Sequence, residues 1–172
     1  MFYQKKLDCS LWGKLYRSSL FKNIRLPNGL LYEDLAIIYP LLLISNRLIK
    51  TDCPLYFYVI RKDSTLGIFN RKRTDVLNIL DSLEDKLILE KSVYLSAVRS
   101  RNLSAHFNIL GLVARFNGKY TDIENRCWNY IKSRRLVCLV DRNIRLKNII
   151  GILVSFLGIK ILKTVEKMIV MR

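Results

Sequence analysis

The sequence predicts an α/β fold for residues 1–71 and a mainly helical region for residues 72–172. Two observations carry this prediction. The β-favouring residues 55–60 follow directly after Pro54, which is the pattern of a short strand. From residue 72 onward, apolar residues instead recur at helical spacing. We place the boundary between the two parts next to Arg71.

In the first part we expect two helices, two short strands and their connections. The second helix begins with two acidic residues, and acids favour the positive end of the helix dipole. Pro40 lies inside that helix and should kink it, because proline removes a backbone hydrogen bond. In chain order the elements are a helix over 10–22, a turn-rich connection over 24–32, a helix over 33–45, strands at Ile49 and over 55–60, and a loop over 61–71.

The second part reads as a series of amphipathic helices. The first presents one apolar face, with Asp81, Glu84 and Asp85 opposite as a solvated face. A second helix covers 92–116 and ends at Asn117-Gly118, since glycine commonly stops a helix. Further helices are expected over 120–136 and 143–170, the last broken at Gly151 or Gly158. The apolar face of the first helix consists of Val76, Leu77, Leu80, Leu83 and Leu87.

Glu33 and Asp34 are the most informative residues of the chain. They are adjacent carboxylates in a chain with 14 acidic and 30 basic residues. One interpretation is a plain helix start, stabilised by about 0.3–1 kcal/mol per acid. The other is catalytic, because a fixed carboxylate can take a proton from a substrate hydroxyl. The residues around the pair decide between the two.

Five short motifs surround the pair in a defined order. Together they cover residues 9–65, and this order resembles the C-terminal half of the catalytic domain of family 2 glycosyltransferases of the bacterial surface-polysaccharide type. The resemblance implies a GT-A fold for this part of the chain. The motifs are W-x-K-L-Y-R at 12–17, L-F-x-x-I-R-x-P-x-G at 20–29, Y-E-D-L at 32–35, P-L-Y-x-Y at 54–58, and R-x-x-S at 61–64.

The resemblance implies a reaction. The parent enzyme would transfer a sugar, with inversion, from a nucleotide-sugar donor to a glycan or lipid-linked glycan acceptor. Asp34 matches the general base that deprotonates the acceptor hydroxyl, and Glu33 would orient that base or the acceptor. A positioned base contributes roughly 10²–10⁴-fold to a rate.

Substrate-binding roles follow from the same motifs. Arg61 matches an arginine near the leaving diphosphate, where a fixed cation stabilises developing charge. A solvated cation at a strand end is the alternative for this residue. Ser64, with Thr65 beside it, belongs to the same trailing motif. Trp12 and Lys14, in the first motif, are the remaining substrate-binding candidates.

The donor-binding part of the family pattern is missing. Family members begin with a nucleotide-binding half, whose Asp-x-Asp motif holds the donor diphosphate through a divalent metal, Mg or Mn. No Asp-x-Asp occurs in the 172 residues, so we predict neither metal ligands nor cofactor-binding residues in this chain. We therefore expect the acceptor-side half of a truncated or split enzyme, inactive by itself.

The basic excess points to an anionic partner. The net charge is +16, and the C-terminal segment 142–172 carries seven bases against Glu166 alone. Its charge-free run, 148–159, is shorter than the roughly 20 residues that span a bilayer. Lys160, Lys163 and Lys167 share one face beside apolar residues. This segment is therefore either an amphipathic helix on an anionic membrane surface or a helix packed on the core.

Composition limits the other classes. The bases form no single stripe, and zinc-finger spacing is absent, which argues against nucleic acid as a partner. Four cysteines without a C-x-x-C pair, together with the lone His106, indicate reduced, buried thiols in a cytoplasmic protein. No secretory signal is visible, so the expected location is the cytoplasm, with the inner face of the membrane as a peripheral site. The alternative function is a non-enzymatic basic helical module that docks on a membrane or a partner protein.

Overall fold

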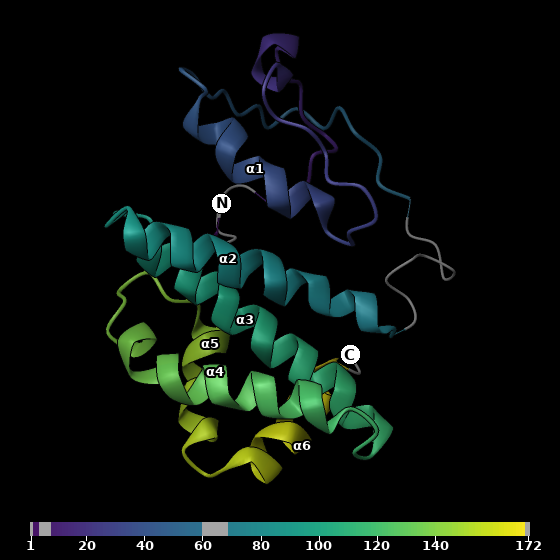
Figure 1. Cartoon of the computed structure of the whole chain (residues 1–172), viewed down its shortest axis with the longest axis vertical. Helices are drawn as coiled ribbons and strands as arrows, with labels where there is room; N and C mark the ends of the chain where they lie inside the picture. The colour runs from purple at the N-terminus through teal and green to yellow at the C-terminus, as the bar shows by residue number, and fades with distance from the viewer. Residues whose placement is uncertain (1, 4–7, 60–68, 171–172) are drawn as a thin grey trace.

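The predicted α/β fold is wrong, because every regular element in the described part of the chain is helical. The computed structural model describes residues 2–3, 8–59 and 69–170. Within these ranges there is no strand and no sheet, so the described residues among 1–71 do not show the GT-A fold. Figure 1 shows α1 and long connecting segments on one side of a group of five helices, α2 to α6. The domain boundary near residue 71 stays a prediction.

The N-terminal part holds one α-helix. The helix expected over 10–22 is reduced to the 3-10 turn η1, Ser18–Phe21. The expected helix that starts at the acid pair is confirmed as α1, Glu33–Leu43, and it includes Pro40. Leu35 and Ile38 of α1 are buried in the core, and α1 contacts α2. This packing fixes the start of α1 against the helical part.

Residues 46–59 show why the strand prediction fails. They lie in an irregular, exposed segment, and Phe57 is 92% exposed. β-Favouring side chains fit well on a pleated, half-buried surface, but they do not make the backbone form a strand without a neighbouring strand. A strand needs a partner for its hydrogen bonds, and no described segment supplies one.

The helical part follows the periodicity of the sequence closely. Asn117 and Gly118 both have positive φ, 46° and 85°, and separate two helices as expected. Gly158, with φ of 99°, separates the last two, whereas Gly151 lies inside a helix. The elements are η2 Arg71–Thr74, α2 Asp75–Leu89, α3 Leu95–Val113, η3 Ala114–Phe116, α4 Thr121–Leu139, α5 Leu146–Ser155 and α6 Ile159–Val170.

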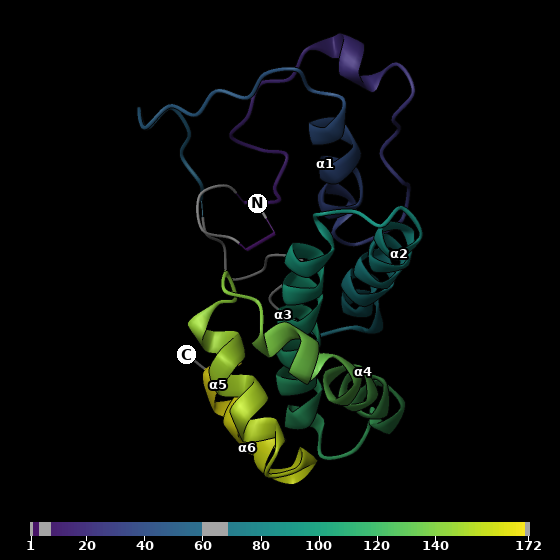
Figure 2. The same ribbon diagram turned by 90° about the vertical axis from the view of Figure 1, so that its left-hand side faces the viewer.

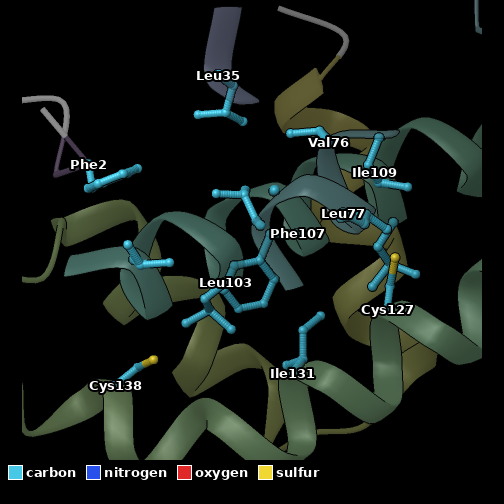
Figure 3. Packing of buried hydrophobic residues seen from close by; sticks show 14 of the residues in the cluster. Phe2, Leu35, Val76, Leu77, Leu103, Phe107, Ile109, Cys127, Ile131 and Cys138 are labelled. Atoms are coloured by element: carbon cyan, nitrogen blue, oxygen red, sulfur yellow. The ribbon is translucent and has the colours of Figure 1, made fainter. Parts of the chain in front are cut away.

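Helix α3 forms the centre of the molecule. It contacts α2, α4, α5 and α6, and Figure 2 shows it between the α5–α6 pair and the α2–α4 side. Phe107 of α3 is 1% exposed, and Figure 3 shows it in the middle of the core beside Leu103 and Ile131. A Cβ at Gly151 would lie 2.9 Å from the Phe107 ring. Glycine at this position therefore lets α5 approach α3 closely.

The solvated acidic face predicted for α2 is wrong at Glu84, which is only 2% exposed, and Asp81 is partly buried and bonded to Asn102 and Arg126. Glu84 Oε1 accepts hydrogen bonds from Arg99 Nε at 3.1 Å and Arg134 Nε at 2.9 Å. Its Oε2 accepts from Asn102 at 3.2 Å and from the Tyr130 hydroxyl. The polar side of α2 therefore faces α3 and α4 at this point, not solvent.

His106 and the cysteines are mostly core residues. His106 is fully buried, its Nδ1 lies 3.0 Å from the Asn102 carbonyl oxygen, and its ring stacks on Tyr130. Burial lowers the pKa of His106 to about 4. The cysteines are free thiols, and three of them are buried as expected, whereas Cys53 is exposed.

The C-terminal segment packs on the bundle. In α6, Leu162 and Glu166 are buried, and Lys163 Nζ pairs with Glu124 Oε2 at 2.6 Å. These contacts agree with the core-packing alternative for α6. Lys160 and Lys167 line a surface cavity beside Asn117. Within the described ranges, no helix has both the length and the apolar character needed to cross a membrane.

Candidate functional site

The acid pair lies at the first turn of α1, where the backbone changes direction. Tyr32 precedes the helix with φ of 68°, a left-handed conformation that is uncommon for a non-glycine residue. Glu33 is exposed and Asp34 is half-buried. Asp34 Oδ1 accepts a hydrogen bond from the Leu35 amide at 2.7 Å, and Leu35 is 2% exposed. The buried Leu35 therefore anchors the position of the Asp34 carboxylate.

Asp34 is a stronger base than an ordinary aspartate. Burial raises its pKa, and the negative charges of Glu33 and Asp8 raise it further, although backbone hydrogen bonds oppose the shift. Asp8 differs, because hydrogen bonds from Lys14 and Ser10 hold its pKa below the usual value against the effect of burial. Carboxylates whose environments push their pKa values apart are the arrangement that acid–base chemistry uses.

Tyr16 and Cys9 complete the surroundings of Asp34. The Tyr16 hydroxyl is buried and has no hydrogen-bond partner among the described residues. Burial raises the pKa of Tyr16, and Asp8 and Asp34 add to this effect. The buried Cys9 thiol interacts with both Asp34 and Arg101 of α3. Asp34 therefore has the acids Glu33 and Asp8 as electrostatic neighbours, and Cys9 has both Asp34 and the base Arg101.

Lys14 belongs to the same neighbourhood. Its ammonium donates to Asp8 Oδ1 at 2.6 Å and to the Ser10 carbonyl oxygen at 2.7 Å. The Lys14 side chain is 19% exposed. In this arrangement the lysine holds the loop that carries Asp8 and Ser10. Its predicted contact with substrate stays untested.

Trp12 lies in an exposed aromatic group. Its ring stacks on Tyr58 with a centroid distance of 4.8 Å and on Tyr56 at 5.3 Å. All three residues are exposed. The packing joins the first motif to the P-L-Y-x-Y motif, and Trp12 and Tyr56 are 44 residues apart in the chain. Aromatic faces that stay in water are suited to contact with the apolar face of a ligand.

Among the predicted site residues, Glu33 acts on Asp34 through its charge. Lys14 is connected to Asp34 through Asp8, which accepts a hydrogen bond from Lys14 and acts on Asp34 through its charge. Arg61, Ser64 and Thr65 lie outside the described residues, so their predicted roles are unchanged. Sequence analysis missed Asp8, Tyr16 and Arg101. Tyr16 lies in the W-x-K-L-Y-R motif, so its position was available, whereas no motif marks Asp8 or Arg101.

A metal site needs several His, Cys, Asp or Glu side chains close together. Among the described residues, no group of three or more His, Cys, Asp or Glu could hold a metal ion. Asp8 and Asp34 form a pair without a third ligand of this kind.

Comparison with known proteins gives one partial similarity. No family model matches the chain, and no solved structure matches it. Over 80 residues it is 34% identical to glycosyltransferase GlyA of Streptococcus pneumoniae serotype 4 (strain ATCC BAA-334 / TIGR4). The match covers 46% of this chain and 11% of that protein. The chain thus shares a segment with a much longer protein that is named a glycosyltransferase, and the match spans 11% of the length of that protein.

Proposed function

We propose that this chain is a segment of an inverting glycosyltransferase of the family 2 type, on the acceptor side of the reaction. Asp34 takes the proton from the acceptor hydroxyl, and the oxygen then attacks the anomeric carbon of a nucleotide-sugar donor. The bond from that carbon to the donor phosphate breaks, and the nucleoside diphosphate leaves. The acceptor is a glycan or a lipid-linked glycan.

One observation carries the proposal. The carboxylate at the motif position of the general base is half-buried, anchored by Leu35 and more basic than usual. Burial raises the pKa of Asp34, against the dipole at the helix N-terminus, which favours the charged carboxylate. The segment shared with the pneumococcal glycosyltransferase supports the same class of reaction. The proposal rests on motifs and local chemistry, independently of a GT-A fold.

The other residues have supporting roles. Glu33 raises the basicity of Asp34 through its charge and remains exposed to orient an acceptor. Trp12, stacked on two tyrosines, offers a flat surface for a sugar ring. The divalent metal of the intact family enzyme has no group of three or more His, Cys, Asp or Glu ligands among the described residues. No step proposed here passes through it.

The test is a transfer assay in a longer enzyme that contains this segment. Asp34→Asn should lower the rate by roughly 10²–10⁴-fold and leave donor affinity unchanged, because only proton removal is lost. The control is Asp52→Asn, which removes an exposed acid paired with Lys50. A rate for Asp34→Asn within threefold of wild type would rule out the general-base role. The chain alone, given nucleotide sugars and metal, should show no turnover.

A second candidate function is supported by the outer face of α5. Leu146, Ile150 and Leu153 recur at helical spacing there and are 71%, 47% and 55% exposed. The basic residues Lys147 and Lys160 lie near the two ends of this face in sequence. We propose that this face rests on an anionic membrane, where each basic residue near the surface contributes about 1 kcal/mol. This site would place the protein on the inner surface of the cell membrane.

Vesicle sedimentation tests this location. Ile150→Glu should reduce binding to vesicles with anionic lipid by at least about tenfold, because a charged side chain replaces an apolar one that would insert into the membrane interface. Val93→Glu is the control, since Val93 is 86% exposed and lies in the turn between α2 and α3, away from α5 in sequence. Equal sedimentation of both variants and wild type would exclude α5 as the membrane contact.

A further inference from the structure

A basic cavity of about 320 Å³ lies between α3, the start of α5 and the residue that precedes α1. Its charged lining residues are Arg73, Arg101, Arg145 and Lys147. The other described residues that line it are neutral. The cavity has the size of a small-ligand site, for which about 300 Å³ is the lower end of the usual range.

Arg101 of α3 is one of the partly buried cations of this cavity. Its Nε is buried and has no hydrogen-bond partner among the described residues. Burial lowers the pKa of Arg101, and the like charge of Arg145 lowers it further, although Cys9 has the opposite effect. A buried cation without a carboxylate partner is costly, so buried charges are normally paired. An anion in the cavity would offset part of the cost of burying the Arg101 charge.

The start of α5 adds to the attraction for an anion. Arg145 directly precedes the helix, and no acidic residue occupies its first turn. The unsatisfied amides and the dipole at a helix N-terminus favour negative charge. Glu166 of α6 acts on Lys147 from outside the cavity lining, but it is 1% exposed and burial raises its pKa. Glu166 therefore acts on one of the four cations of the cavity, and no acidic residue is among the described residues that line the cavity itself.

We propose that this cavity binds a phosphate-bearing anion of the size of a diphosphate, held by Arg101, Arg145 and Lys147. Guanidinium groups match phosphate oxygens in a bidentate geometry. Tyr32, which directly precedes Glu33 and Asp34 in the chain, lines the cavity, whereas the two acids do not. The role of the anion in transfer rests on the proposed function: the diphosphate belongs either to the donor or to a lipid carrier of the acceptor.

The test is isothermal titration of the full chain with inorganic pyrophosphate at low salt. Arg145→Gln should weaken binding by about tenfold or more, since it removes a charge-assisted hydrogen bond. Arg142→Gln is the matched control, because Arg142 is exposed and lies outside the cavity lining. Lys147→Gln provides a second variant if Arg145→Gln unfolds. Equal affinity in the variants and the control, or no binding at about 10 mM pyrophosphate, would overturn the proposal.

Competition distinguishes the sources of the diphosphate. Stronger displacement of pyrophosphate by uridine diphosphate identifies the donor side, and stronger displacement by geranyl diphosphate identifies a lipid carrier. Failure of both to displace it contradicts the site. The result is independent of the transfer assay: pyrophosphate binding together with full activity of Asp34→Asn would refute the catalytic proposal and retain the anion site.

Discussion

Replacing Glu84 by Gln should destabilise the helical part strongly. The carboxylate of Glu84 is 2% exposed and accepts hydrogen bonds from four side chains of α3 and α4. In Glu84→Gln the negative charge disappears, while Arg99 and Arg134 remain close to each other. The amide group can also donate, and the Tyr130 hydroxyl then competes for a single acceptor oxygen.

The size of the effect follows from the burial of the partners. Removing one partner from a fully buried ion pair costs about 3–5 kcal/mol. The side chains of Arg99 and Arg134 are 21% and 33% exposed, so water can solvate part of their charge. We therefore expect a loss of about 2–3 kcal/mol in the free energy of unfolding. For a chain of this length that loss lowers Tm by about 4–12 °C.

Urea unfolding followed by far-ultraviolet circular dichroism measures this difference. Asp85→Asn is the matched control, because Asp85 is the exposed acid next to Glu84 in α2. The control should change stability by less than about 0.5 kcal/mol. If Glu84→Gln were as stable as Asp85→Asn, the buried ion cluster would not hold α2, α3 and α4 together, and the reasoning would be refuted.

Three further predictions concern the core and the thiols. Gly151→Ala should destabilise by about 1–3 kcal/mol in a thermal melt, because its Cβ meets the Phe107 ring at 2.9 Å; an unchanged Tm would show that α5 can move away. The pKa of His106 is about 4 when folded and 6.5 when unfolded, so the unfolded state binds more protons between these values. Stability should therefore be complete above about pH 6.5 and fall by about 3 kcal/mol toward pH 4, and His106→Phe should lose this slope in urea titrations. Cys53 should give the single fast phase with a thiol reagent, since the other three thiols are buried; a fast phase that persists in Cys53→Ser would contradict the described exposure.

The helices of the second part were predictable because their signals are local. An apolar residue every three or four positions marks the buried face of α2. Residues 117–118 and Gly158 adopt positive φ where a chain stops a helix. The start of α1 at Glu33 was likewise visible, because acids favour a helix N-terminus. These features depend on neighbours within one or two turns.

The features that failed depend on partners distant in the chain. The segment with Phe57 is β-favouring, but a strand forms only beside another strand. Glu84 has the spacing of a solvated acid, and only the packing of α3 and α4 makes it a buried acceptor. Arg101 and Arg145, which lie 44 residues apart, share a cavity because α5 packs on α3. The spacing of residues in the sequence does not predict these contacts between segments that are distant in the chain.

The pH dependence of kcat/KM for sugar transfer tests the central claim most directly. In a longer enzyme that contains this segment, the acidic limb of the profile reports the pKa of the essential base. Because the pKa of Asp34 is raised, activity should begin to fall at a higher pH than an ordinary aspartate would allow, and this limb should vanish in Asp34→Asn along with most of the rate. An acidic limb that stays in place in the Asp34→Asn enzyme, at an undiminished rate, would show that another group accepts the proton.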